Sequence, residues 1–341
     1  MNLLGPVMID VDSFELTKED RDVLLNPLVG GVILFTRNFK SKEQIYNLIQ
    51  AIKKLRTPSL LVAIDHEGGR VQRFKDPFTT IPALRLLGEK YDENPEVALK
   101  DAQTFGWLTA IELLSFNIDF SFTPVLDVDY EMSGVIGDRA FHHSPVIIAK
   151  LAKAYIKGMH LAGMTSTGKH FPGHGGVTAD SHTDMPVDNR NLDYLLENDI
   201  VPFRELIPES LDGIMPAHVV YENIDNNPAC FSSFWLKDIL RDKLKFEGVI
   251  FSDDLDMEGA SCISDNYTDR ATAALNAGCD MALVCNNRNA ATQVLDKLEY
   301  SVTELTSQHL LKMRGKETIS WDELVKNEQW KNSVKMVKKY K

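Results

Sequence analysis

The chain has 341 residues, of which 44% are hydrophobic and 25% are charged. These fractions are typical of a soluble globular protein and differ from those of disordered, collagen-like or membrane proteins. The 37 basic and 49 acidic residues give a net charge of −12, so the field of the chain repels polyanions and we expect no nucleic-acid partner. No apolar run approaches the ~18 residues of a membrane-spanning helix, and we expect no membrane partner.

The cysteine content and the start of the chain bear on the compartment. Four cysteines without CxxC spacing are too few for a disulfide scaffold, and a reducing cytoplasm suits them best. They are Cys230, Cys262, Cys279 and Cys285. The first ten residues contain no basic segment, and Gly5 and Pro6 interrupt their apolar stretch, which is unlike a signal peptide. We therefore expect a cytoplasmic protein whose chain begins with a strand.

Eight short apolar runs that are rich in β-branched residues recur along the chain and predict strands. In chain order these runs are Val7–Asp10, Gly31–Phe35, Leu60–Asp65, Phe120–Asp127, Met164–His170, Gly213–His218, Gly248–Asp253 and Met281–Cys285. Their hydrophobicity is continuous, as in strands covered on both faces, and residues 41–55 and 145–162 between them have helical spacing. Eight βα units without GxGxxG after the first strand favour a closed TIM-type (β/α)8 barrel over a doubly wound sheet.

The rest of the chain, from about residue 290 to residue 341, is polar, rich in Lys and helical in pattern. Its ~50 residues are too few for a second catalytic domain, and Trp321 and Trp330 can pack it onto the barrel. No linker or low-complexity segment separates it from the preceding chain. We therefore predict a single domain, residues 1–341, with a C-terminal helical extension packed on the barrel.

Polar residues gather at the predicted carboxyl ends of the strands, where barrels of this type place their active sites. The first group lies in Asp65–Arg73 (DHEGGRVQR), which combines acids with two arginines, and Arg139 follows the fourth strand. A carboxylate can accept hydrogen bonds from sugar hydroxyls, and the cations can bind hydroxyls or anions. We therefore expect a polar pocket at this end of the barrel.

A glycine-rich segment, Gly168–Gly176 (GKHFPGHGG), follows the fifth strand, and its Pro and glycines predict a loop. His170 and His174 are four residues apart, which on a helix would suggest a metal site, but in a loop they need not share a face. A plain glycine turn whose histidines have structural hydrogen bonds is the other interpretation. Further along, Asp180 precedes His182 by two residues. At this spacing a carboxylate can orient an imidazole and stabilise its cationic form, as a general acid/base requires.

The seventh predicted strand ends in two adjacent carboxylates, Asp253 and Asp254, with Asp256 close behind. Buried or crowded carboxylates cost free energy unless a partner or a reaction uses them. One of the two could cap the following helix, and the other could be catalytic. The pattern alone does not choose between Asp253 and Asp254.

Together these motifs resemble those of family 3 glycoside hydrolases, and within that family the single-domain bacterial β-N-acetylhexosaminidases of peptidoglycan recycling. The resemblance rests on segments that span most of the chain: Leu34–Asn38, Asp65–Arg73, Lys169–Gly175 with Asp180–His182, Met215–His218, Ile250–Asp254 and Val284–Arg288. It implies a retaining exo-β-N-acetylglucosaminidase that needs no metal or organic cofactor. The implied substrate is a muropeptide, N-acetylglucosamine linked to anhydro-N-acetylmuramic acid with or without peptide, and we expect a monomer.

The resemblance also implies a role for each matching residue. Asp253 would be the nucleophile that forms a glycosyl-enzyme intermediate, and His182, with Asp180 as its partner, would be the general acid and then the base. The residues that would bind the terminal sugar are Asp65, Arg73, Arg139, Lys169 and His170. Two positions depart from the family pattern, since His66 stands where the family commonly has Gln and Asp256 stands where relatives often have Ser.

Two other functions stay open on the residues alone. The first is a metal-dependent barrel amidohydrolase, whose ligands would be His170, His174, His182 and Asp253. Loss of activity on chelation, or stoichiometric zinc in the purified protein, would favour it. The second is a non-catalytic sugar-binding protein on a barrel scaffold, which would bind with ordinary affinity and show slow or absent turnover.

Overall fold

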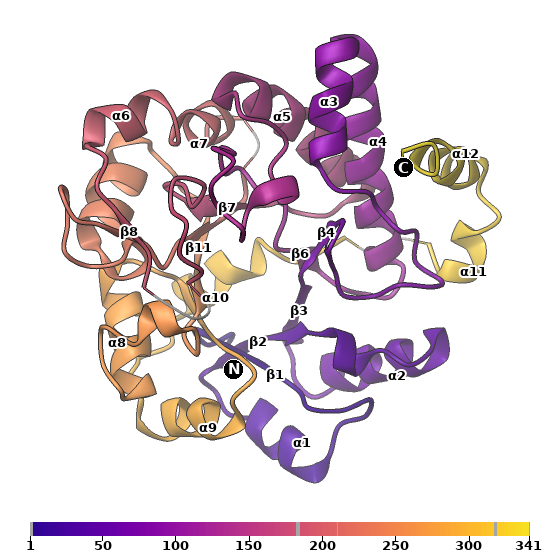
Figure 1. The fold of residues 1–341 in the computed structure, drawn as a ribbon. Coiled ribbons are helices and arrows are strands. Elements are labelled where there is room, and N and C mark those ends of the chain that lie inside the picture. Colours follow the sequence, from indigo (N-terminus) through magenta and orange to yellow (C-terminus); the bar gives the residue numbers. More distant parts are fainter. Residues whose placement is uncertain (1–2, 182–184, 210, 317–318, 341) are drawn as a thin grey trace.

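The structure is a computed structural model that describes residues 3–181, 185–209, 211–316 and 319–340. The eight predicted runs each form a parallel strand: β1 (Val7–Asp10), β2 (Val29–Leu34), β3 (Leu61–Ile64), β6 (Phe120–Ser121), β7 (Thr167–Phe171), β9 (Gly213–Pro216), β11 (Val249–Asp254) and β12 (Met281–Val284). Their order in the sheet is β6-β3-β2-β1-β12-β11-β9-β7. Two bridges, Phe120 with Thr165 and Val125 with Lys169, join the outer strands, so the sheet nearly closes (Figure 1). The TIM-type barrel is confirmed.

Helices surround the barrel on its outside (Figure 1). They are α1 (Lys18–Leu24), α2 (Lys42–Lys53), α3 (Arg85–Glu93), α4 (Pro95–Leu114), α5 (Pro145–Ala162), α6 (Leu192–Glu197), α7 (Val201–Leu206), the π-helix η4 (Phe234–Lys243), α8 (Tyr267–Ala277) and α9 (Arg288–Lys297). Helix α2 illustrates why these segments are helical. Ser41 caps its N-terminus by accepting a hydrogen bond from the backbone N–H of Gln44. Its residues Ile45, Leu48, Ile49 and Ile52 recur at helical spacing and are buried.

Aromatic rings fill the interior of the barrel. Phe120 on β6 and Phe122 just after it each lie 5.3 Å, between ring centroids, from Phe251 on β11. Strands β6 and β11 are not neighbours in the sheet, so these contacts cross the interior. The barrel is therefore a packed core, and an open site can form only where the strands end.

The fourth strand is shorter than the predicted Phe120–Asp127, since β6 ends at Ser121. The chain beyond it still runs beside β7, where the backbone N–H of Leu126 donates to the carbonyl of Lys169 at 2.6 Å. Pro124 interrupts the regular ladder because proline has no N–H to donate. Strand β7 also begins later than predicted and extends to Phe171, so the glycine-rich loop begins at Pro172 rather than at Gly168.

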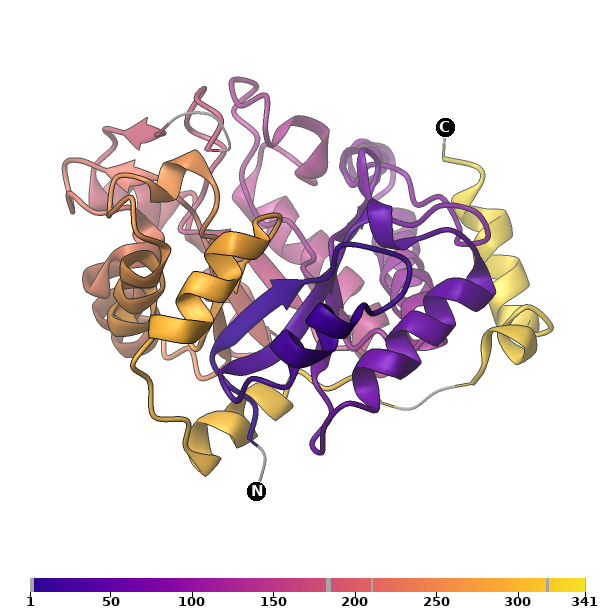
Figure 2. The ribbon, with the colours of Figure 1, turned by 90° about the horizontal axis from the view of Figure 1, so that it is seen from below.

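The C-terminal helices α10 (Glu304–Leu311), α11 (Trp321–Leu324) and α12 (Glu328–Val337) lie against the outside of the barrel (Figure 2). Trp321 packs its ring on Phe78 and Phe116, with centroid distances of 5.5 and 5.3 Å. Trp330 donates its indole N–H to Glu112 on α4 at 2.8 Å. The two tryptophans thus combine apolar burial with a hydrogen bond to the barrel helices.

The described helices also bear on membrane insertion. Within residues 3–181, 185–209, 211–316 and 319–340, no helix combines the length and the hydrophobicity needed to cross a bilayer.

Candidate active site

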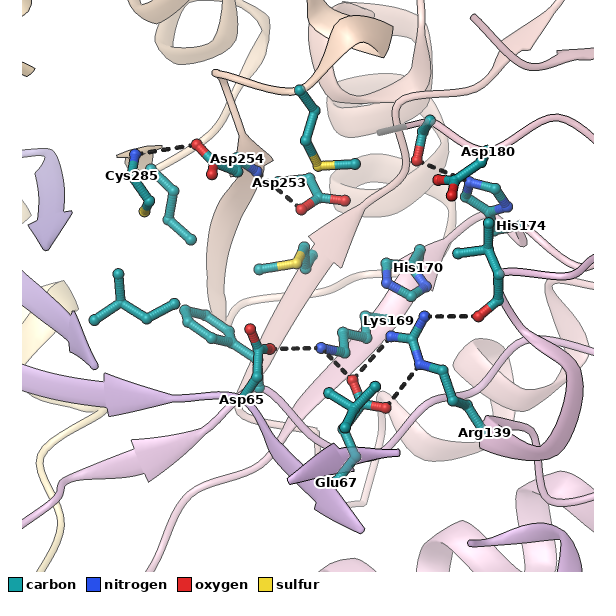
Figure 3. A pocket seen from close by; sticks show the side chains of 18 of the residues that line it. Asp65, Glu67, Arg139, Lys169, His170, His174, Asp180, Asp253, Asp254 and Cys285 are labelled. Atoms are coloured by element: carbon teal, nitrogen blue, oxygen red, sulfur yellow. Dashed lines mark hydrogen bonds and ion pairs between the residues drawn. The ribbon is translucent and has the colours of Figure 1, made fainter. Parts of the chain in front are cut away.

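A cavity of about 590 Å³ opens at the carboxyl ends of the strands, which is within the size range of small-molecule sites. Figure 3 shows its charged side chains converging from several strands. Of the residues that the sequence predicted for the site, those that line the cavity are Asp65, Arg73, Arg139, Lys169, His170, Asp180 and Asp253. The predicted general acid, His182, lies outside the described residues.

One side of the cavity is built from a cluster of ion pairs in which Glu67 and Lys169 are buried and Asp65 and Arg139 are partly buried (Figure 3). The ammonium group of Lys169 lies 2.9 Å from Asp65 and 2.7 Å from Glu67. Arg139 donates two hydrogen bonds of 2.8 Å to the carboxylate of Glu67. A bidentate arginine fixes a carboxylate in both position and orientation, so the cluster is rigid before any ligand enters.

These ion pairs keep both carboxylates ionised. Burial raises the pKa of Asp65, but Lys169 and Arg73 outweigh it and hold that pKa well below its usual value. Burial likewise raises the pKa of Glu67, but Arg139 and Lys169 lower it to about 2. At neutral pH, Asp65 can therefore act as a hydrogen-bond acceptor toward a ligand.

His170 is oriented by Asp127, a fully buried carboxylate. The distance from His170 Nδ1 to Asp127 Oδ2 is 2.7 Å, and the backbone N–H groups of His170 and His174 also donate to Asp127. Burial raises the pKa of Asp127, but His170 outweighs it and the pKa is lowered. The pairing of Nδ1 leaves Nε2 as the ring nitrogen of His170 that can meet a ligand.

The opposite side of the cavity is the end of β11, where Asp253 and Asp254 point in different directions (Figure 3). Asp254 Oδ1 accepts hydrogen bonds of 3.1 Å from the backbone N–H groups of Asp256 and Cys285, and its Oδ2 accepts one from the side chain of Asn286. Asp253 accepts a bond of 2.8 Å from the backbone N–H of Asp254. The carboxylate of Asp254 is thus tied to the chain around it.

The two carboxyl groups also differ in charge state. Burial raises the pKa of Asp254 to about 7, and the charge of Asp253 adds to this effect. Burial also raises the pKa of Asp253, but the neighbouring His218 and His170 outweigh it and keep the pKa below its usual value. Asp253 is therefore ionised at neutral pH, which a carboxylate nucleophile requires.

The loop after β7 is anchored at its beginning and near Ser181. Tyr221 donates its hydroxyl to the carbonyl of Gly173 at 2.6 Å, and the backbone N–H of Gly259 donates to the carbonyl of Ser181 at 2.9 Å. Gly175 is required, because a Cβ there would lie 1.7 Å from the carbonyl oxygen of Val128. These anchors bring Asp180 to the cavity, on the same side as His174 (Figure 3).

The histidines of this region have hydrogen-bond partners of their own. His170 Nδ1 is paired with Asp127, and His174 Nε2 lies 3.2 Å from the hydroxyl of Ser181. Burial lowers the pKa of His174 to about 4, so this ring is neutral at pH 7. Within the described part of the chain, no three His, Cys, Asp or Glu side chains are arranged to hold a metal.

The two departures from the family pattern have local partners of their own. Asp256 accepts hydrogen bonds from the hydroxyl of Tyr267 at 2.7 Å and from the amide of Asn287 at 2.9 Å. The ring of His66 packs near Phe78, and burial lowers its pKa to about 3. Neither side chain lines the cavity.

Sequence reasoning did not assign a role to Glu67, Asp127 or His218, which pair with or lie beside the predicted residues. All three stand at or near strand ends, and that position was the available signal. Their partners come from distant parts of the chain, as in the pair of Glu67 with Arg139, 72 positions apart. Such pairs follow from the register of the barrel and not from local sequence.

Comparison with known proteins gives the family. The sequence model of a protein family, the glycosyl hydrolase family 3 N-terminal domain, matches residues 6–312 of this chain. Two curated proteins named beta-hexosaminidase, from Thioalkalivibrio sulfidiphilus and Nitrosospira multiformis, are 53% and 51% identical to this chain. The alignments cover 97% and 98% of this chain and 94% and 95% of theirs. The chain belongs to glycosyl hydrolase family 3.

This family 3 enzyme is a β-hexosaminidase, a glycoside hydrolase. Among solved structures, NagZ from Neisseria gonorrhoeae in complex with N-trifluoroacetyl-D-glucosamine is 42% identical, with a TM-score of 0.93. The match covers 98% of this chain and 97% of that chain. The family decides against both the barrel amidohydrolase and the non-catalytic sugar-binding protein.

Proposed function

We propose that this β-hexosaminidase is a retaining exo-β-N-acetylglucosaminidase that removes terminal β-linked N-acetylglucosamine from peptidoglycan fragments. The observation that carries the proposal is the end of β11, where Asp253 and Asp254 both line the cavity, but Asp253 is ionised while Asp254 is held by backbone N–H groups. The ligand of the similar NagZ structure, N-trifluoroacetyl-D-glucosamine, supports an N-acylated glucosamine as the sugar. The proposed aglycone is anhydro-N-acetylmuramic acid, with or without peptide.

In this proposal the ion-pair cluster binds the hydroxyls of the terminal sugar. Asp65 accepts from hydroxyl groups, because an ionised carboxylate has no proton to donate. Lys169, Arg73 and His170 supply donors around it. Arg139 already donates to Glu67 and to the carbonyl of Val135, so it acts mainly by fixing Glu67 against Lys169.

The first chemical step forms the glycosyl-enzyme intermediate. An oxygen of Asp253 forms a bond to the anomeric carbon as the bond from that carbon to the aglycone oxygen breaks. His182, oriented by Asp180, gives its proton to the departing oxygen. The position of His182 rests on the family resemblance, because the residue lies outside the described structure.

The second step releases the sugar. His182, now neutral, takes a proton from water as the water oxygen bonds to the anomeric carbon, and the bond to Asp253 breaks. Two displacements at the same carbon return the β configuration. Phosphate could replace water as the acceptor, and the products distinguish the two.

We also propose that the enzyme acts as a cytoplasmic monomer without a metal or organic cofactor. All four cysteines are free thiols, and three of them are buried. A reducing compartment preserves such thiols, which agrees with a cytoplasmic substrate.

The experiment that tests the proposed function compares 4-nitrophenyl β-N-acetylglucosaminide with the matching β-glucoside, with and without a chelator. We expect hydrolysis of the N-acetylated substrate in clear preference, no change on chelation, and a β-anomeric product by NMR. Equal rates on both sugars, loss of activity on chelation or an α-anomeric product would each contradict it. Repeating the assay in phosphate buffer and testing for sugar 1-phosphate identifies the acceptor.

A further inference from the structure

His218 lies buried behind the reactive end of β11. It follows β9 by two residues and has no exposed surface. Its Nε2 lies 3.0 Å from the backbone carbonyl oxygen of Asp254. A carbonyl can only accept, so Nε2 carries a proton and donates it to this bond. His218 is thus joined to the backbone of the residue that follows Asp253.

The ring of His218 is held on several sides. It stacks on Phe231, with a centroid distance of 5.3 Å and an angle of 11° between the planes. A Cβ at Gly259 would lie 2.8 Å from the Cβ of His218, so this chain segment packs tightly against it. Its Nδ1 is buried and has no oxygen or nitrogen partner among the described residues. Such packing fixes the ring with little room for another rotamer.

The charged and titratable groups around His218 are Asp253 and Asp254 on β11 and Cys230 on η3 (Ala229–Phe231). Burial lowers the pKa of His218, but Cys230 and Asp253 outweigh it and raise this pKa to about 9. In return, His218 is the foremost of the groups that lower the pKa of Asp253 against the effect of burial. The imidazolium and the carboxylate therefore stabilise each other's charged forms.

We propose that His218 is a positioning residue for Asp253, which it serves by fixing the backbone of β11 and by placing a positive charge behind the carboxylate. The inference rests on the proposed function, in which Asp253 is the nucleophile. A positive charge behind this carboxylate keeps it ionised for the first step. The same charge makes the carboxylate less basic and therefore a better leaving group when water attacks in the second step.

The test is the variant His218→Gln, whose side-chain amide can still donate a hydrogen bond but carries no charge. We expect the acidic limb of the pH profile of kcat/KM to move to higher pH by about one unit. Loss of the positive charge on the side chain at position 218 raises the pKa of Asp253. We expect kcat on a nitrophenyl glycoside to fall about tenfold with a parallel fall in KM, because the glycosyl-enzyme accumulates when its breakdown slows. Mass spectrometry of the quenched enzyme measures the accumulated intermediate.

The matched control is His66→Gln, the same change at another buried histidine, which should keep the wild-type pH profile. If His218→Gln does not fold, His218→Asn tests the same idea, since its amide also carries no charge and should move the acidic limb in the same direction. A wild-type acidic limb without accumulated intermediate, in whichever variant folds, would overturn the inference. Full activity in Asp253→Ala would instead overturn the proposed function itself.

Discussion

Asp65 and Asp253 are both carboxylates at the ends of barrel strands and both line the same cavity, yet their neighbours differ. Asp65 has the cations of Lys169 at 2.9 Å and Arg73 at 3.2 Å. The described residues form no such close ion pair with Asp253, whose hydrogen bond comes from the backbone N–H of Asp254. A carboxylate in close ion pairs is held in place as a hydrogen-bond acceptor. A carboxylate without such ion pairs keeps an oxygen free to attack. In the proposed mechanism, binding and reaction therefore take place on two different sides of the cavity.

The largest effect should come from the reactive side. Asp253→Ala should lower kcat by about ten-thousandfold or more, because no other group supplies the nucleophile. Asp254→Asn should cost less than about tenfold, since its role is to accept bonds from backbone N–H groups and asparagine keeps one acceptor. Steady-state rates on a nitrophenyl glycoside measure both. The reverse ranking would assign the nucleophile to Asp254.

The next effect concerns the general acid. His182→Ala should lose about a thousandfold in the first step on a natural disaccharide, and far less on a nitrophenyl glycoside, whose leaving group needs no proton. Asp180→Ala should show the same dependence with a smaller loss, because the imidazole remains but is less well oriented. Single-turnover rates on the two substrates provide the comparison. Equal fractional losses on both would mean that His182 is not the acid.

Substitution on the binding side of the cavity, at Asp65, should be seen in kcat/KM. Asp65→Asn should lower kcat/KM by about a hundredfold, because an amide cannot replace an acceptor that meets hydroxyl donors on both oxygens. Lys169 keeps its partner Glu67 in this variant, so we expect the fold to persist, with an unchanged circular dichroism spectrum. Near-normal kcat/KM would make Asp65 a scaffold residue and remove the distinction between the two sides.

The ion-pair cluster also predicts how stability changes with pH. The folded-state pKa of Glu67, about 2, lies below its value of ~4.3 in an unfolded chain. Its stabilisation is therefore present above pH ~4.3 and is lost as the pH falls toward 2. Glu67→Gln should be less stable at pH 7 by about 3 kcal/mol, and this difference should shrink between pH ~4 and 2.

Thermal melts across this range test the prediction. The exposed Glu93, paired with Lys90 on the surface, offers the control Glu93→Gln, which should change little at any pH. A difference between wild type and Glu67→Gln that stays constant with pH would show that the charge of Glu67 is not its source.

The fold could be predicted because each strand is covered on both faces and so appears as a continuous apolar run. The strand at Phe120 was predicted too long, since apolar residues continue past Pro124 although the regular ladder does not. The residues alone left Asp253 and Asp254 open, and the family resemblance implied Asp253. The structure adds that the two side chains alternate in direction and that Asp254 is the one held by backbone N–H groups. Glu67 is identified only by its partners Arg139 and Lys169, which come from distant parts of the chain.

The smallest effect is expected where the chain departs from its family. Asp256→Ser should change kcat/KM by less than about threefold, because the carboxylate is occupied by Tyr267 and Asn287 and does not line the cavity. The same nitrophenyl assay, run across pH, measures it. A shifted acidic limb would show that the charge of Asp256 reaches Asp253 after all.

The most direct test of the central claim, that Asp253 is the carboxylate which reacts, is covalent trapping. The enzyme is incubated with a mechanism-based fluorosugar of the N-acetylglucosamine series, digested and sequenced by mass spectrometry. The account predicts one sugar attached to the carboxylate of Asp253, with activity returning as the label is slowly released. A label on Asp254, or inhibition without any covalent adduct, would contradict it.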